Sequence, residues 1–135
     1  MRVFVDTGAL LALGHARDQN HRAARLLAQR QSAAGGRYLG STLVLAEFHT
    51  HLLYLRGPVA AAAALGMLLA DPQHEWRNVP SEMIQEARAT WLLRFSDQAI
   101  SLTDAVSFEI MKREKLTHAF GFDRHFEIVG FSLLR

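Results

Sequence analysis

The fold of this chain is decided by one stretch, Arg2-Val3-Phe4-Val5-Asp6-Thr7-Gly8-Ala9-Leu10-Leu11. Val3, Phe4 and Val5 are β-branched or aromatic in unbroken succession, which is typical of a central parallel strand covered on both faces. Asp6 then stands at the carboxyl end of this strand. Because ligands of open α/β sheets bind outside the carboxyl ends of the strands, this position favours a carboxylate with a chemical role.

Asp6 also has a plainer interpretation. Aspartate is a favoured N-cap residue, and the helix-forming run Ala9–Leu13 follows it, so its side chain can simply cap the next helix. Taken alone, the stretch favours the cap. The rest of the sequence has to decide between the two interpretations.

The composition limits the chemistry that the chain can carry out. The sequence has 135 residues, enough for a single domain over residues 1–135 with a sizeable core, and it has no cysteine. The absence of cysteine excludes thiol nucleophiles, thiolate zinc sites and iron–sulfur clusters, and it fits a reducing compartment. The 15 basic and 13 acidic residues give a formal charge of only +2, so nucleic-acid binding has to come from a local patch.

We expect a soluble, cytoplasmic protein without a membrane segment. No basic region followed by an apolar region and a cleavage site precedes Asp6. The longest apolar run, Val59–Ala70, is too short to span a bilayer. This run is either a helix of the chain's own core or a surface that docks a partner or a second copy, and the sequence leaves both open.

The rest of the sequence alternates between strand and helix patterns. Strands are predicted over residues 37–40 and 74–79, and helices over residues 20–34, 43–56 and 58–70. Ser81 is predicted to cap a further helix, whose apolar face is formed by Ile84, Ala87, Trp91 and Phe95. This alternation is typical of a compact α/β domain with a mainly parallel sheet.

The helix over residues 43–56, capped by Ser41 or Thr42, carries a second acid. Its apolar residues recur at helical spacing, and Glu47 falls on the shoulder of that stripe. A carboxylate at the edge of a buried surface is costly unless it is paired, hydrogen-bonded or bound to a metal. A shoulder glutamate can also simply be solvated, so Glu47 alone decides nothing.

The last third of the chain adds two more acids. Thr103 is predicted to cap a helix with Asp104 in its first turn, where the helix dipole by itself favours a negative charge. The apolar run His118–Phe122 then ends in Asp123, just as the first strand ends in Asp6. If the two strands are parallel neighbours, both acids leave the same edge of the sheet. Asp104 and Glu47 can converge on that edge.

Four converging carboxylates favour a bound cation. Two unit charges at 4 Å repel each other by roughly 4 kcal/mol at an effective dielectric constant of 20. Some of the acids therefore keep a proton, or a cation is held among them. Oxygen ligands without cysteine or a chelating histidine pair select a hard ion such as Mg²⁺ or Mn²⁺, which activates water for phosphodiester hydrolysis.

Together these motifs resemble the PIN-domain family, in particular its VapC-like toxin ribonucleases. The resemblance spans nearly the whole chain in the family's order and rests on four motifs, Val5-Asp6-Thr7, Leu45-Ala46-Glu47, Ser101-Leu102-Thr103-Asp104 and Gly121-Phe122-Asp123-Arg124-His125-Phe126. It implies a three-layer α/β/α domain that cleaves RNA. It also implies that the catalytic, metal-binding residues are a quartet of acids, Asp6, Glu47, Asp104 and Asp123, which holds one or two Mg²⁺ or Mn²⁺ ions. One position departs from the family pattern, because Gly121 stands where a threonine or serine is usual.

The resemblance also implies partners. These are an RNA substrate, a small cognate antitoxin that inserts a segment into the site, operator DNA reached only through the antitoxin, and a second copy in a homodimer. Arg124 is a candidate for a phosphate contact or for a surface ion pair.

Two other functions compete with the nuclease. An aspartyl-phosphate phosphotransferase also places an acid after a strand, but its chemistry needs a second acid two residues later, where this chain has Gly8. A non-catalytic module of the same fold that binds RNA or protein predicts the loss of one or more quartet acids, and all four are present.

Overall fold

The computed structural model describes all 135 residues and contains a five-stranded sheet. Every pair of neighbouring strands is parallel, and their order is β3-β2-β1-β4-β5. The strands are β1 (Arg2–Val5), β2 (Arg37–Ser41), β3 (His74–Arg77), β4 (His118–Phe120) and β5 (Ser132–Leu133). The helices are α1 (Thr7–Gly14), α2 (His21–Ala33), α3 (Thr42–Arg56), α4 (Pro58–Ala70), α5 (Ser81–Ala87), the π-helical segment η1 (Arg88–Leu92), α6 (Leu102–Arg113) and α7 (His125–Ile128).

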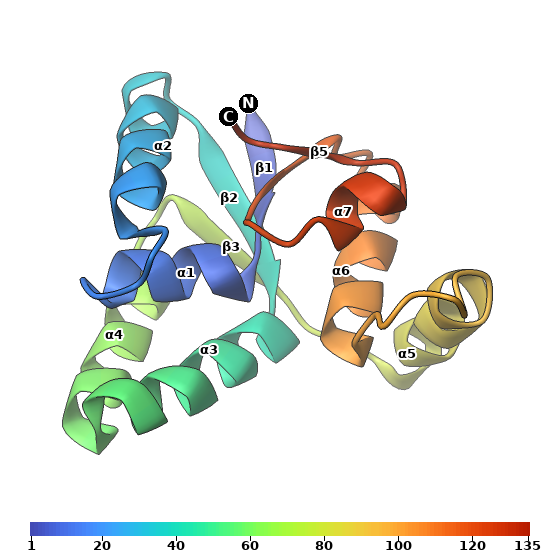
Figure 1. Cartoon of the computed structure of the whole chain (residues 1–135), viewed down its shortest axis with the longest axis horizontal. Helices are drawn as coiled ribbons and strands as arrows, with labels where there is room; N and C mark the ends of the chain where they lie inside the picture. The colour runs from blue at the N-terminus through green and yellow to red at the C-terminus, as the bar shows by residue number, and fades with distance from the viewer.

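Helices lie on both sides of this sheet. In Figure 1, α1, α2 and α4 lie to the left of the strands, and α5, α6 and α7 lie to the right. The two groups pack among themselves, since α1 contacts α2 and α3, α3 contacts α4, and α5 and η1 pack on α6. The predicted α/β/α architecture with a mainly parallel sheet is confirmed.

Strand β1 lies in the middle of the sheet, as its unbroken apolar run predicts. Val3, Phe4 and Val5 are buried, with β2 on one side and β4 on the other. The register pairs Val5 with Phe120, and the Asp6 N–H donates to the Phe120 carbonyl oxygen over 2.9 Å. The two strands that precede Asp6 and Asp123 are therefore parallel neighbours, and they end at the same edge of the sheet.

Two helix starts, those of α3 and α6, test the predicted caps. Ser41 caps α3, because its Oγ accepts a hydrogen bond from the Val44 N–H. The prediction for α6 is wrong, since Ser101 rather than Thr103 is its N-cap and accepts from the Asp104 N–H. The spacing explains this outcome, because a serine three residues before an acid forms the N-terminal capping pattern. Asp104 still lies in the first turn of α6.

The helix predicted from Ser81 through Phe95 is shorter than expected and differently capped. Pro80 occupies the N-cap position of α5, and Ser81 is the first helical residue. The α-helix ends at Ala87 and continues as the wider π-helical turn η1. Trp91 in η1 is buried, and its indole N–H donates to the Glu109 carboxylate of α6 over 3.0 Å.

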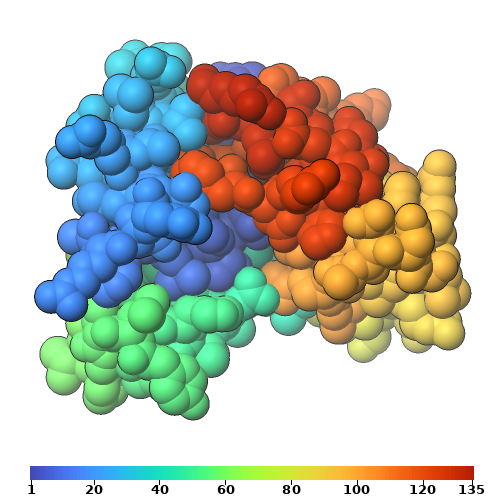
Figure 2. All heavy atoms as spheres, viewed as in Figure 1, coloured from blue at the N-terminus to red at the C-terminus, as the bar shows by residue number.

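Helix α4 is mostly exposed despite its apolar sequence. Only Ala61 is buried, whereas Val59, Met67 and Leu69 are 84%, 75% and 60% exposed. Burial in the chain's own core therefore does not explain this apolar run. Figure 2 shows α3 and α4, in green, projecting at the lower left of the molecule. The length and hydropathy needed to cross a membrane are met by none of the helices.

Candidate active site

Asp6 is buried at the carboxyl end of β1. Its backbone occupies the N-cap position of α1, but its side chain makes no capping hydrogen bond, so the cap interpretation of this residue is wrong. The side chain is 5% exposed, and its Oδ1 atom has no hydrogen-bond partner. The Thr7 hydroxyl beside it is likewise buried without a partner. Buried polar atoms without a partner are rare in proteins, so these two are available to a bound ion or a water molecule.

The charge state of Asp6 reflects this burial. Loss of solvent raises the pKa of the Asp6 carboxyl from 3.8 to about 8. Three further acids act in the same direction, Asp104 most strongly, followed by Glu47 and Asp123. At neutral pH the side chain therefore keeps a proton unless a cation replaces it.

Asp104 and Asp123 form the half-buried part of the site. Burial, the charge of Asp123 and a hydrogen bond with Asp123 together raise the pKa of the Asp104 carboxyl from 3.8 to about 6. Asp104, Asp123 and His125 each offer one ligand atom, and these atoms lie within 4.8 Å of one another. The start of α6 and the segment after β4 thus meet at one point.

Glu47 faces the same site from α3. It is partly buried, as its place on the helix shoulder predicts, and its charge acts on both Asp6 and Asp104. Arg124 is exposed and takes part in no ion pair, so the surface-pair alternative for this residue is wrong. The structure therefore brings the four predicted acids into one electrostatically coupled group, and the exposed Arg124 follows Asp123 in the sequence.

The donor set fits a hard divalent cation. Three aspartates and a glutamate could supply oxygen ligands, which Mg²⁺ and Mn²⁺ prefer, and a bound cation would relieve the mutual repulsion of the acids. The unpartnered Asp6 Oδ1 would be a buried ligand for such an ion. Sequence reasoning missed two polar side chains of this site, Thr7 and His125, although both stand next to or near a predicted acid.

Gly121 allows Asp6 to stand where it does. A Cβ atom at position 121 would lie 3.0 Å from the Asp6 Cβ and 3.4 Å from its Oδ2. Both residues continue paired strands, so neither backbone can move away freely. Glycine at position 121, where the family usually has threonine or serine, thus allows the chain after β4 to pack closely against the Asp6 side chain.

We expect Gly121→Ala to destabilise the chain by about 1–3 kcal/mol, the usual range for overpacking, and to weaken Mn²⁺ binding because it displaces Asp6. Urea unfolding and Mn²⁺ affinity measure the two effects. Gly66→Ala is the matched control, since a Cβ at that exposed helical position meets nothing within 4 Å. Equal stability and equal Mn²⁺ affinity in Gly121→Ala and the wild type would contradict the assignment.

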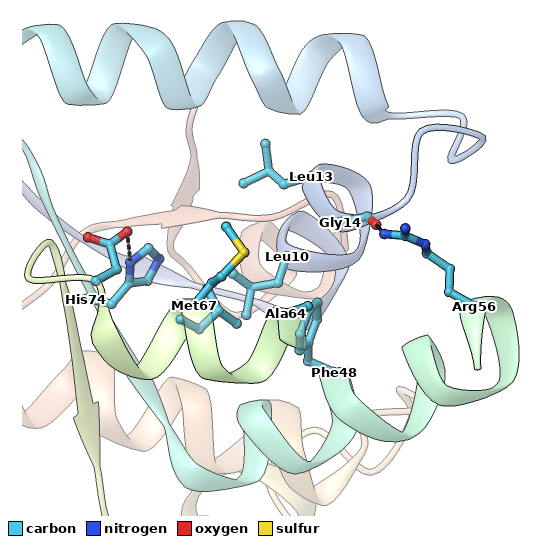
Figure 3. Close-up of a pocket in the computed structure, with 10 residues that line it drawn as sticks. Leu10, Leu13, Gly14, Phe48, Arg56, Ala64, Met67 and His74 are labelled. Carbon is cyan, nitrogen blue, oxygen red and sulfur yellow. Dashed lines mark hydrogen bonds and ion pairs between the residues drawn. The ribbon is translucent and has the colours of Figure 1, made fainter. Parts of the chain in front are cut away.

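An apolar groove lies away from the acids, between α1 and α4 (Figure 3). Its walls are mainly Leu10, Leu13, Phe48, Met67 and Leu68. One end holds the hydrogen-bonded side chains of Asp71 and His74, and the other holds Arg56, whose guanidinium donates to the Gly14 carbonyl oxygen. In Figure 2, the N-terminal residues in dark blue lie between the C-terminal segment in red and α3 in green.

A parallel five-stranded sheet with a coupled group of acids at its carboxyl edge is the arrangement of a PIN domain. The PIN-domain profile matches residues 3–132, so the chain belongs to the PIN-domain family.

Relatives within this family are similar over nearly the full length. The chain is 33% identical over 134 residues to the 23S rRNA-specific endonuclease VapC20 of Mycobacterium tuberculosis, covering 98% of each chain. The crystal structure of that protein, described as a sarcin–ricin loop cleaving toxin, superposes with a TM-score of 0.83 at 32% identity and covers 96% of this chain and 95% of the other. The structure of VapBC2 from Rickettsia felis bound to a promoter DNA fragment gives a TM-score of 0.67 over 98% and 97% of the chains, at 15% identity, and shares the fold.

Proposed function

We propose that this chain is a divalent-metal-dependent endoribonuclease, the toxin of a VapBC-like pair, that hydrolyses phosphodiester bonds in ribosomal RNA. The observation that carries the proposal is the meeting of Asp6, Asp104 and Asp123 at one edge of the sheet, with Asp6 buried and unpartnered. Similarity to a 23S rRNA-specific endonuclease over nearly the whole chain supports the substrate class.

We propose different roles for the four acids of the site. We assign Asp6 and Asp104 as the principal ligands of one or two Mg²⁺ or Mn²⁺ ions, with Glu47 and Asp123 completing the site or orienting water. When bound, such an ion activates water and stabilises charge on the entering and leaving oxygens. Arg124 is exposed and unpaired, so its guanidinium is free to contact a phosphate.

Cleavage of ribosomal RNA tests the proposal. We expect purified chain to cut 23S rRNA with Mg²⁺ or Mn²⁺ but not with EDTA, and Asp104→Asn to lower the rate by about 10³-fold, as the loss of a group that stabilises transition-state charge typically does. Asp97→Asn is the control, because Asp97 is exposed and outside the acid group. Absence of cleavage by folded, metal-loaded protein freed of any antitoxin would favour the alternative, a non-catalytic RNA- or protein-binding PIN module.

Apolar features of the surface support the proposed partners. We propose that a small antitoxin inserts a segment into the acid site and also packs on the apolar groove between α1 and α4. Operator DNA is then bound only through this antitoxin, and the exposed residues of α4 join two copies in a homodimer. The groove's apolar walls, with Arg56 at one end and Asp71 at the other, suit an amphipathic segment with charged ends. The product of a neighbouring small reading frame should raise the thermal midpoint and inhibit cleavage; if it does neither, the antitoxin proposal fails.

A further inference from the structure

His125 lies against the fourth acid of the site in an unusual way. Its Nδ1 atom is 2.9 Å from the Asp123 Oδ1 atom. The same carboxylate oxygen already accepts a hydrogen bond from the His125 backbone N–H, also over 2.9 Å. The Nδ1 atom is buried, and the geometry of its contact is not that of a hydrogen bond, so it remains without a hydrogen-bond partner. The ring as a whole is 22% exposed.

The spacing of these atoms is compatible with two ligands on one ion. Ligands at about 2.1 Å from an octahedral cation lie about 3 Å apart when they occupy neighbouring positions. The separation of Nδ1 and Oδ1 matches this edge, and a carboxylate oxygen of Asp104 completes a group within 4.8 Å. The lone pair of Nδ1 is available when the proton of the ring is on Nε2. A buried nitrogen without a partner thus points into a group of carboxylates.

We propose that His125 supplies a ring-nitrogen ligand to the ion held by Asp104 and Asp123, and that this ligand makes the site prefer Mn²⁺ to Mg²⁺. The inference rests on the proposed metal-dependent function. Mg²⁺ is bound almost entirely through oxygen, whereas imidazole nitrogen suits transition metals, whose affinity follows the ligand type. An all-oxygen quartet lacks this discrimination.

Binding of Mn²⁺ alone, followed by electron paramagnetic resonance of the free ion, tests the preference. We expect His125→Asn to weaken Mn²⁺ binding by about tenfold, a usual cost of losing a group at a metal site. The affinity for Mg²⁺ should change little, so that a lower Mg²⁺ concentration than in the wild type displaces half of the bound Mn²⁺. His118→Asn is the matched control, since His118 begins β4 and contacts Thr117 rather than the acids. Equal Mn²⁺ affinity in His125→Asn and the wild type would overturn the proposal.

Pulsed electron paramagnetic resonance of the wild type gives a second test that needs no variant to fold. Coordinated imidazole produces nitrogen modulation of the Mn²⁺ signal, and ¹⁵N-labelled histidine shifts its frequencies. Bound Mn²⁺ without this modulation would overturn the role of His125 and leave the metal-dependent nuclease intact. Failure of the wild type to bind Mn²⁺ at all would overturn both.

Discussion

Asp6→Asn is expected to make the metal-free chain more stable above neutral pH and to abolish its stabilisation by Mg²⁺ or Mn²⁺. The wild-type side chain is 5% exposed, and burial followed by the charge of Asp104 raises its pKa from 3.8 to about 8. Asparagine has a similar shape and no charge, and its amide can donate to the neighbouring carboxylates. The variant therefore loses the ligand but also loses the cost of a buried acid.

The sign of the pH dependence follows from the raised pKa. Below about pH 4 the carboxyl is protonated in the folded and the unfolded chain, and its stabilising effect is fully present. As the pH rises toward 8, the unfolded chain releases this proton while the folded chain keeps it, so stability is lost. The stability of Asp6→Asn relative to the wild type should thus increase by on the order of 2–4 kcal/mol between about pH 5 and pH 8.

Chemical unfolding in EDTA across this pH range measures the difference, and thermal midpoints with added metal measure the lost stabilisation. Asp97→Asn serves as the control, because its exposed carboxylate should leave both quantities as in the wild type. Parallel stability profiles of Asp6→Asn and the wild type between about pH 5 and pH 8 would show that Asp6 ionises freely in the folded chain.

Arg113→Ala is expected to destabilise the packing of α5 against α6 strongly. The Glu109 carboxylate of α6 is 2% exposed, and the Arg113 guanidinium donates to it over 2.6 Å. The same guanidinium reaches both oxygens of Glu82 in α5. Without Arg113, the Glu109 carboxylate keeps the Trp91 N–H and the more distant Lys112 ammonium but loses its nearest cation. Removing one partner of a buried ion pair typically costs about 3–5 kcal/mol. This loss is a large part of the stability of an ordinary domain.

Urea unfolding tests this expectation. Circular dichroism is the better probe, because the fluorescence of Trp91 would respond to the mutation directly. Lys112→Ala is the matched control. Its ammonium is 53% exposed and 3.6 Å from Glu109, so it should cost less than about 1 kcal/mol. The double variant Glu109→Leu with Arg113→Met should regain much of the loss, because apolar replacement of a whole buried pair is often tolerated. Equal stability of Arg113→Ala and Lys112→Ala would contradict the role of the ion pair.

Local patterns in the sequence determined most of the architecture. The apolar run before Asp6 predicts a central strand because a strand covered on both faces needs no alternation, and β1 lies there. Helices α2, α3 and α4 follow from caps and glycine or proline breaks that act within a few residues. By contrast, α7 and β5 have four and two residues, which is too short for any periodicity to show.

Only the tertiary structure decided what the acids and the apolar run do. The sequence orders the four acids along the chain, but the pairing of β1 with β4 and the burial of Asp6 arise from contacts between distant segments. The contact of His125 with Asp123 depends on the turn after β4, and the exposure of α4 depends on which of its faces the other helices cover. Strand and helix formation is governed by neighbours in sequence, whereas pKa shifts, unpartnered atoms and exposed faces are governed by neighbours in space.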